Sequence, residues 1–157
     1  MSNFKNRIHE YQTYLNIRLE VVRENPVKYI QIKTSKNLCN EFKETMFKSP
    51  NEVFKAVHLN SKNIILGVET ISIGTLSSSL VHPRDAFKCA IINNSASIVF
   101  MHNHPSGDPQ PSNDDIEITQ RLKQAGDILG IKVFDHIIFG DFKNPYFSFA
   151  DSDNGIL

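Results

Sequence analysis

The sequence has little cysteine. Cys39 and Cys89 are the only two among 157 residues, and they are not spaced as a CxxC pair. Such pairs are the usual signature of cysteine-based zinc and redox sites, and small secreted domains depend on several disulfides. Both classes are therefore disfavoured. We interpret the two residues as reduced thiols in or just below the core, which predicts a cytoplasmic protein.

Long apolar runs and an excess of one charge are missing as well. No stretch approaches the about 18 apolar residues that cross a bilayer, and the opening MSNFKNRIHEYQ has no apolar centre of the signal-peptide kind, so we expect no membrane partner. Seventeen basic and seventeen acidic residues cancel, which removes a general attraction to nucleic acid. Nine basic against five acidic residues in 1–50 give nucleic-acid binding its only, weak support.

Hydrophobic periodicity predicts helices and strands that alternate along the chain. Helices are expected at 3–24, 35–47, 82–94 and 112–130, and strands at 27–32, 52–59, 64–74, 97–102, 131–140 and 146–150. Ser35 and Ser112 are the expected N-caps of their helices, and Gly130 the expected end of the last one. The pattern indicates an α/β or α+β fold with a central sheet, in which 1–28 form a helical extension and 29–157 a single domain.

His102 and His104 stand at the end of the expected strand 97–102. Side chains two residues apart on a strand point to the same face, so both imidazoles can reach one point while Asn103 is turned away. After ten intervening residues the chain reaches Asp115, in the first turn of the next helix. Two imidazoles and a carboxylate suit zinc, and three protein ligands leave a fourth position for water, as in catalytic rather than structural zinc sites.

Simpler explanations exist for each of these residues. Ser112 and Asp115 have the S-x-x-D spacing of a capping box, which accounts for both. The prolines of 105–111 are typical of a surface loop, and Asp108 and Asp114 are alternative carboxylates. The conjunction of HxHP at a strand end, a Pro/Gly loop and S-x-x-D at a helix start favours a metal site, with Asp115 as the ligand.

The same conjunction, HxHPx6SxxD, resembles the metal signature of the JAMM (JAB/MPN-plus) metalloproteases. It stands here as His102, His104, Pro105, Ser112 and Asp115. Residues 74–141, with HNHPSGDPQPSNDD and DHIIFG, closely resemble the RadC family within that superfamily, and the similarity extends over roughly 30–152. The resemblance implies a JAB/MPN-like (cytidine-deaminase-like) architecture, which is a curved central mixed sheet with flanking helices.

The resemblance also implies the chemistry. His102, His104 and Asp115 would hold one Zn²⁺ per chain, and a glutamate from an early strand would act beside it. The RadC pattern EVFxxxxL places that glutamate at Glu52, as the general base, and Ser112 would donate to the developing oxyanion. The implied activity is that of a zinc metallopeptidase, which hydrolyses a peptide or isopeptide bond in a peptide or protein substrate.

Two residues have roles that spacing alone leaves open. Glu69, in the second strand of the expected hairpin, competes with Glu52 as the acid beside the metal. His136, in DHIIFG, could contact a metal ligand or the substrate, or it could be a hydrogen-bonded histidine of the sheet.

A second function follows from the association of the RadC family with DNA repair. Full-length RadC proteins resemble this chain plus an N-terminal helix-hairpin-helix module that binds DNA, and residues 1–28 contain no glycine for such a hairpin. We therefore expect the short, stand-alone form. The alternative function is an accessory protein in DNA repair or mobile-element biology, whose metal site is not catalytic.

Overall fold

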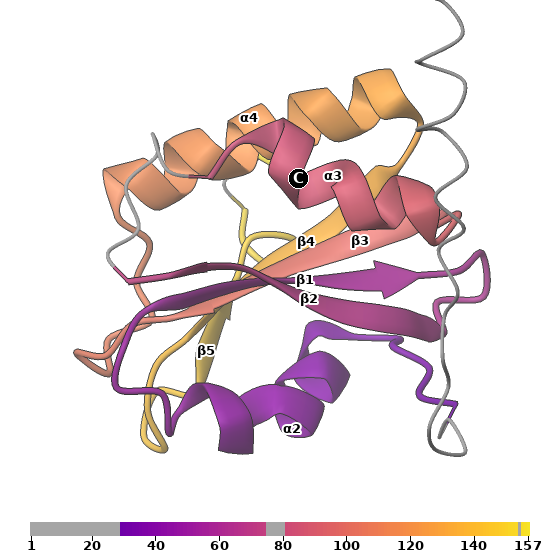
Figure 1. Ribbon diagram of the computed structural model, residues 1–157. Helices are drawn as coiled ribbons and strands as arrows, with labels where there is room; N and C mark the ends of the chain where they lie inside the picture. Colours follow the sequence, from indigo (N-terminus) through magenta and orange to yellow (C-terminus); the bar gives the residue numbers. More distant parts are fainter. Residues whose placement is uncertain (1–28, 75–80, 154) are drawn as a thin grey trace, which may run out of the picture.

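In the computed structural model, the described residues are 29–74, 81–153 and 155–157. They form a five-stranded sheet with helices on both faces (Figure 1). The helices are α2 (Ser35–Met46), α3 (Pro83–Ile92) and α4 (Asn113–Leu129). The strands are β1 (Val53–Leu59), β2 (Ile65–Ile73), β3 (Ser97–Asn103), β4 (Lys132–Phe139) and β5 (Tyr146–Ser148). α3 and α4 cover one face of the sheet and α2 covers the other, which gives three layers.

The sheet is mixed, in the order β2-β1-β3-β4-β5. Among the described strands only β3 and β4 run parallel, with α4 as the crossover between them, and the other neighbours are antiparallel. β3 is the central strand, and all its residues are buried. His102 pairs with Phe54 of β1 on one side and with Ile138 of β4 on the other. The predicted α/β (α+β) class with a central mixed sheet is confirmed.

Alternate residues of the central strands build a core on each face. Phe54 and Phe100 pack with Leu122 of α4 on one face, and Val99 packs with Leu38 of α2 on the other. Burying an apolar side chain of this size stabilises a fold by about 1.5–3 kcal/mol. The strand that carries the two histidines is therefore anchored from both sides.

The prediction of a strand at 27–32 is wrong for residues 29–32, which are the part that the structure describes. That part makes a single bridge, between Gln31 and Ile64, because the chain only crosses the end of the β1–β2 hairpin before it turns into α2. The helix expected at 3–24, and with it the extension 1–28, lies outside the described residues.

The N-cap of α2 is Thr34 rather than the predicted Ser35. The Thr34 hydroxyl accepts from the backbone N–H of Asn37, while Ser35 Oγ lies 3.2 Å from Ser148 Oγ, in hydrogen-bond contact with β5. Two adjacent hydroxyls fit the same local pattern. In the structure Thr34 caps the helix and Ser35 contacts β5.

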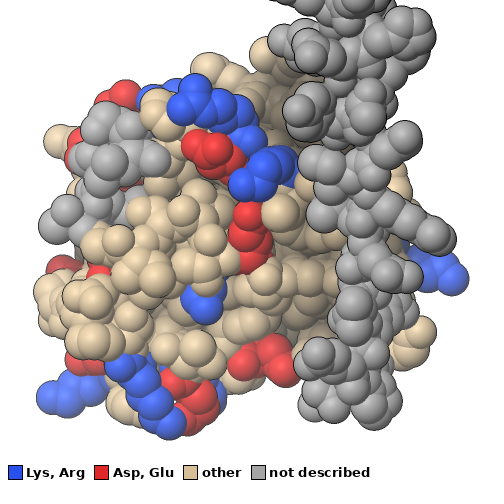
Figure 2. Space-filling view, viewed as in Figure 1, with Lys and Arg blue, Asp and Glu red and all other residues tan. Residues whose placement is uncertain are grey.

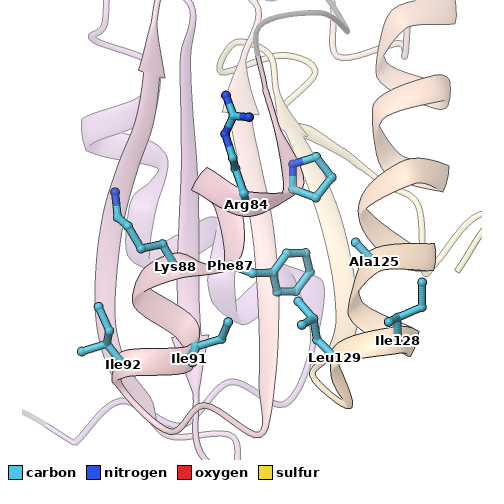
Figure 3. Close-up of a pocket in the computed structure, with 9 residues that line it drawn as sticks. Arg84, Phe87, Lys88, Ile91, Ile92, Ala125, Ile128 and Leu129 are labelled. Atoms are coloured by element: carbon cyan, nitrogen blue, oxygen red, sulfur yellow. The ribbon is translucent and has the colours of Figure 1, made fainter. Parts of the chain in front are cut away.

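Exposed apolar side chains gather in a groove of about 600 Å³ between α3 and α4 (Figure 3). Ile91, Ile128 and Leu129 line it together with the buried Phe87, and Ile128 is 87% exposed. The groove lies at the C-terminal end of α4, about 20 Å along the helix from its first turn, so it is separate from the histidines and Asp115.

No helix in the described ranges is both long and apolar enough to span a bilayer.

Gly140 follows β4 and allows three segments to meet. A Cβ atom built on Gly140 would overlap the carbonyl oxygen of Asn144, and it would lie 2.6 Å from the carbonyl oxygen of Gly107 and 2.8 Å from Pro109 Cδ. Backbone atoms cannot yield as a flexible side chain would. The loop after His104 therefore rests on the end of β4 because position 140 carries no side chain.

We expect Gly140→Ala to lower the free energy of unfolding by roughly 2 kcal/mol or more, because the new methyl group forces backbone segments apart. Urea unfolding measures the difference. Gly67→Ala on β2 is the control, since its Cβ would meet its nearest neighbour, Asn93 Nδ2, at an ordinary 3.5 Å. Equal losses in the two variants would contradict the steric explanation.

Candidate metal centre

Four side chains meet at the end of β3. Glu52 lies just before β1, His102 in β3, His104 just after it, and Asp115 in the first turn of α4. One ligand atom from each lies within 4.8 Å of the others. The β3 strand carries the histidines to the start of α4, and the pairing of Phe54 with His102 brings Glu52 alongside. All four residues are among those that the sequence predicts.

The ligand atoms converge closely. His102 Nε2 lies 3.0 Å from His104 Nε2 and 3.1 Å from Asp115 Oδ1, and His104 Nε2 lies 3.4 Å from Asp115 Oδ2. Glu52 Oε1 is 3.8 Å from His102 Nε2. His102 and Asp115 are buried, whereas the side chain of Glu52 is 20% exposed. Solvent therefore reaches the cluster from the side of Glu52 and of His104, whose side chain is 16% exposed.

A chain of hydrogen bonds decides which nitrogen of His102 carries the proton. The Thr119 hydroxyl donates to the carbonyl oxygen of Asp115 and so accepts from His136 Nδ1–H at 2.6 Å. His136 Nε2 is then an acceptor, and His102 Nδ1–H donates to it at 2.9 Å. Burial holds the pKa of His136 well below its usual value, which keeps the imidazole ring of His136 uncharged. A neutral His102 therefore has a bare lone pair on Nε2, which faces the cluster.

His104 is oriented in the same way from the loop. Its Nδ1 donates to the carbonyl oxygen of Asp108 at 2.7 Å, so a neutral His104 also has a bare Nε2. Two lone pairs and the Asp115 carboxylate then face one another, which is unfavourable unless a proton or a cation lies between them. In the metal-free protein the hydrogen bond to Asp115 raises the pKa of His104, against burial, which lowers it. Two imidazoles and one carboxylate are a donor set that fits zinc.

The Asp115 carboxylate is held ionised and fixed in place. Burial acts to raise the pKa of Asp115, but in the metal-free protein hydrogen bonds from protonated His102 and His104 and from Ser112 hold it far below its usual value. Ser112 donates to Oδ2 from its backbone N–H at 2.7 Å and from its hydroxyl at 2.6 Å. This is the capping box that the S-x-x-D spacing predicts. It leaves Oδ1 facing His102, so one carboxylate can cap the helix and also serve as a ligand.

The hydroxyl of Ser112 serves the helix cap in this structure. Its proton lies in the bond to Asp115 Oδ2, so donation to an oxyanion requires the hydroxyl to turn away from that oxygen. Ser112 is exposed, which leaves room for the turn. The oxyanion role of Ser112 stays a prediction.

The competing carboxylates lie elsewhere. Glu69 Oε2 is 3.9 Å from His58 Nε2, and Glu69 is not part of the four-residue cluster. The Asp108 side chain accepts a backbone N–H within its own loop, and Asp114 is exposed on α4. Glu52 is therefore the second carboxylate beside the histidines.

Two further residues support the cluster from behind. His136 is at once a hydrogen-bonded histidine of the sheet and a contact of His102. Thr119 is not among the residues expected from the sequence, although it lies four positions after Asp115, on the same face of a helix. That spacing is a usable signal. The bond between Thr119 and His136 depends on how α4 packs on β4, which no local pattern reveals.

Thr119→Val keeps the shape of the side chain but removes the acceptor for His136 Nδ1–H, so His102 loses its fixed tautomer. We expect zinc affinity to fall by about 10- to 100-fold, measured by competition with a chromophoric chelator. Thr70→Val, at an exposed position of β2, is the matched control and should bind zinc as the wild type does. Unchanged affinity in Thr119→Val would show that the hydrogen-bond chain does not prepare His102.

The metal-free protein should lose stability as the pH rises. The pKa of His104 in the folded protein is raised above 6.5. The bond between protonated His104 and Asp115 therefore stabilises the fold fully at a pH below the pKa of the unfolded chain, and this stabilisation is lost as the pH rises through the pKa of the folded protein. Urea unfolding with a chelator present, at about pH 5.5 and pH 8.5, measures the loss. His104→Ala should remove most of this difference. A difference of the same size in that variant would assign it to another group.

The chain matches known proteins over most of its length. A family model described as the RadC-like JAB domain matches residues 32–155. A UPF0758 protein of Desulfitobacterium hafniense is 44% identical over 148 residues, which cover 94% of this chain and 63% of that protein. A UPF0758 protein of Caldanaerobacter subterraneus is 53% identical over 110 residues, which cover 70% of this chain and 47% of that protein. The chain thus spans less than two thirds of either relative, and over its own length it belongs to the family of RadC-like JAB domains.

Proposed function

We propose that this protein is a zinc-dependent hydrolase of the JAMM type, which cleaves a peptide or isopeptide bond in a peptide or protein substrate. The observation that carries the proposal is the convergence of His102 Nε2 and His104 Nε2, 3.0 Å apart, on the carboxylate of Asp115. Lone pairs placed in this way are costly without a proton or a cation between them. Membership of the RadC-like JAB family supports the same activity.

Three side chains would hold the ion, namely His102, His104 and Asp115. Three protein ligands leave one position open, which distinguishes a catalytic zinc site from a structural one. A zinc ion bound there would lower the pKa of a water molecule to about 7 and polarise the scissile carbonyl group. His136 and Thr119 would keep the His102 ring in the tautomer that a ligand needs.

Glu52 is the proposed general base. Its Oε1 atom lies 3.8 Å from His102 Nε2 and its side chain is partly exposed, so it borders the space that an attacking water molecule would occupy. The carboxylate would take a proton from that water and deliver it to the leaving amine.

Ser112 is the proposed donor to the oxyanion. Its hydroxyl would turn from Asp115 Oδ2 toward the oxygen that gains charge. The backbone N–H of Ser112 makes a second bond to Oδ2, so Asp115 remains anchored during that turn.

The alternative, a DNA-repair or mobile-element accessory protein with a non-catalytic metal site, has less support. It rests on the basic residues of 1–50, of which the described ones are Lys33, Lys36, Lys43 and Lys48. On the face shown in Figure 2, the described basic side chains are interspersed with acidic ones and are not gathered in one patch. DNA binding that weakens steeply with added salt would favour this alternative.

The two thiols bear on where the protein acts. Cys39 and Cys89 are both free cysteines. Thiols stay free in reducing compartments, and on that basis we propose a cytoplasmic location.

Metal content is the first test of the proposal. Wild-type protein purified without a histidine tag should contain about one zinc per chain by elemental analysis, since its ligand set is that of a single site. His104→Ala and Asp115→Ala should each lose it. His82→Ala is the control, because His82 stands at the start of α3 and outside the cluster. No zinc in the wild type after incubation with zinc would sink the hydrolase proposal.

Hydrolysis is tested on a set of synthetic peptides and Nε-linked isopeptides, with products identified by mass spectrometry. Glu52→Gln should keep about one zinc but lose at least about 100-fold of the activity, which is the usual contribution of a general base. Full activity in Glu52→Gln would show that another group takes the proton.

A further inference from the structure

Asn103 lies between the two histidines, and its side chain turns away from them. It is the last residue of β3 and is 2% exposed. The sequence gives it no role beyond completing the HxH pattern. An amide group buried to this degree needs partners for both its oxygen and its nitrogen.

Those partners are the backbone groups on either side of Glu52. Asn103 Oδ1 accepts from the N–H of Val53 at 2.9 Å, and Asn103 Nδ2 donates to the carbonyl oxygen of Asn51 at 3.1 Å. The chemistry of the partners fixes the orientation of the amide, because an N–H must meet the oxygen and a carbonyl must meet the nitrogen. One side chain thus grips the chain immediately before and after Glu52.

These side-chain hydrogen bonds of Asn103 lie where the backbone pairing of β3 with β1 ends. The backbone register between β1 and β3 ends at the pair Phe54–His102. Two residues further on, the N–H of His104 donates to the carbonyl oxygen of Phe139 of β4 at 2.9 Å, so the main chain follows β4 and carries His104 into the cluster. The Asn103 amide continues the contact with β1 that the backbone of β3 no longer makes.

Glu52 depends on such contacts because it precedes β1 and lies outside the strand itself. From the other side, its carbonyl oxygen accepts from the N–H of Gly74, just after β2, at 2.8 Å. The backbone of Glu52 is therefore held from the β2 side by Gly74 and from the β3 side by Asn103.

We propose that Asn103 is a positioning residue, which sets where the Glu52 carboxylate stands relative to His102, His104 and Asp115. The same strand end thus supplies two ligands and, between them, the amide that places the general base. The inference rests on the proposed function for the role of Glu52, but its geometry can be tested by metal binding alone.

The test is a double-mutant cycle on zinc affinity, measured by chelator competition. Glu52→Gln removes a negative charge beside the ion and should weaken binding by about tenfold, while the site stays filled at micromolar zinc. Asn103→Ala should weaken binding by a similar or smaller factor. If Asn103 acts through Glu52, the double variant binds as Glu52→Gln does, to within about twofold.

The opposite result is equally clear. If the two losses multiply in the double variant, Asn103 supports the histidines independently of Glu52, and the proposal is overturned. Asn93→Ala, which removes an amide bonded to His58 rather than to the segment around Glu52, is the matched control and should leave zinc affinity unchanged.

Hydrogen exchange checks the contact itself. The Val53 amide should exchange about tenfold faster in Asn103→Ala, in line with the loss of one hydrogen bond. If Asn103→Ala does not fold, Asn103→Leu takes its place, since it keeps a side chain of similar volume but offers Val53 no acceptor. Unchanged Val53 exchange and unchanged zinc affinity in the folded variant would refute the grip.

Failure of the proposed function gives a different pattern. In that case the wild type cleaves none of the peptides or isopeptides, yet the zinc cycle and the Val53 exchange still decide whether Asn103 places Glu52. Cleavage by the wild type with multiplied zinc losses would instead keep the hydrolase and reject the positioning role.

Discussion

The hydrogen-bond chain from Thr119 through His136 to His102 is the constraint on which the rest of the site depends. It links α4 to β4 and β4 to β3 inside the core. Breaking one of its bonds would leave a buried polar group unsatisfied, at a cost of about 1–3 kcal/mol. Aromatic rings hold the two imidazoles in plane, since Phe54 stacks on His102 with ring centroids 5.9 Å apart and Phe149 stacks on His136 at 5.3 Å. The same contacts therefore stabilise the fold and orient a ligand.

At the start of α4, Asp115 also serves both the fold and the site. The Asp115 carboxylate closes the capping box with Ser112 through Oδ2 and faces His102 through Oδ1. The positive end of the helix dipole favours a carboxylate in the first turn, so the helix itself helps to keep Asp115 ionised. A residue that local rules explain completely is thus free to serve the cluster as well, because a carboxylate has two oxygens.

The sequence predicts much of this arrangement because its determinants are local. The two histidines lie two residues apart at the end of one strand, and the S-x-x-D cap fixes where the next helix begins, so their meeting point follows from strand and helix geometry. What spacing alone does not settle depends on contacts between distant segments. The choice of Glu52 over Glu69 needs the register of β1 on β3, and the link of His136 to His102 needs the parallel pairing of β3 and β4. The N-cap of α2 is Thr34 rather than Ser35, two adjacent hydroxyls that local spacing does not distinguish.

The separation of these parts along the chain has a consequence for the order of assembly. His102, His104 and Asp115 come from one continuous strand, loop and helix, and the entropy cost of closing a loop grows with its length. Glu52 joins them only when β1 has paired with β3. The segment 102–115 can thus gather its ligand atoms without the N-terminal half of the sheet, whereas the full set of four needs the finished sheet. The ligand atoms and the proposed general base can therefore come together at separate stages of folding.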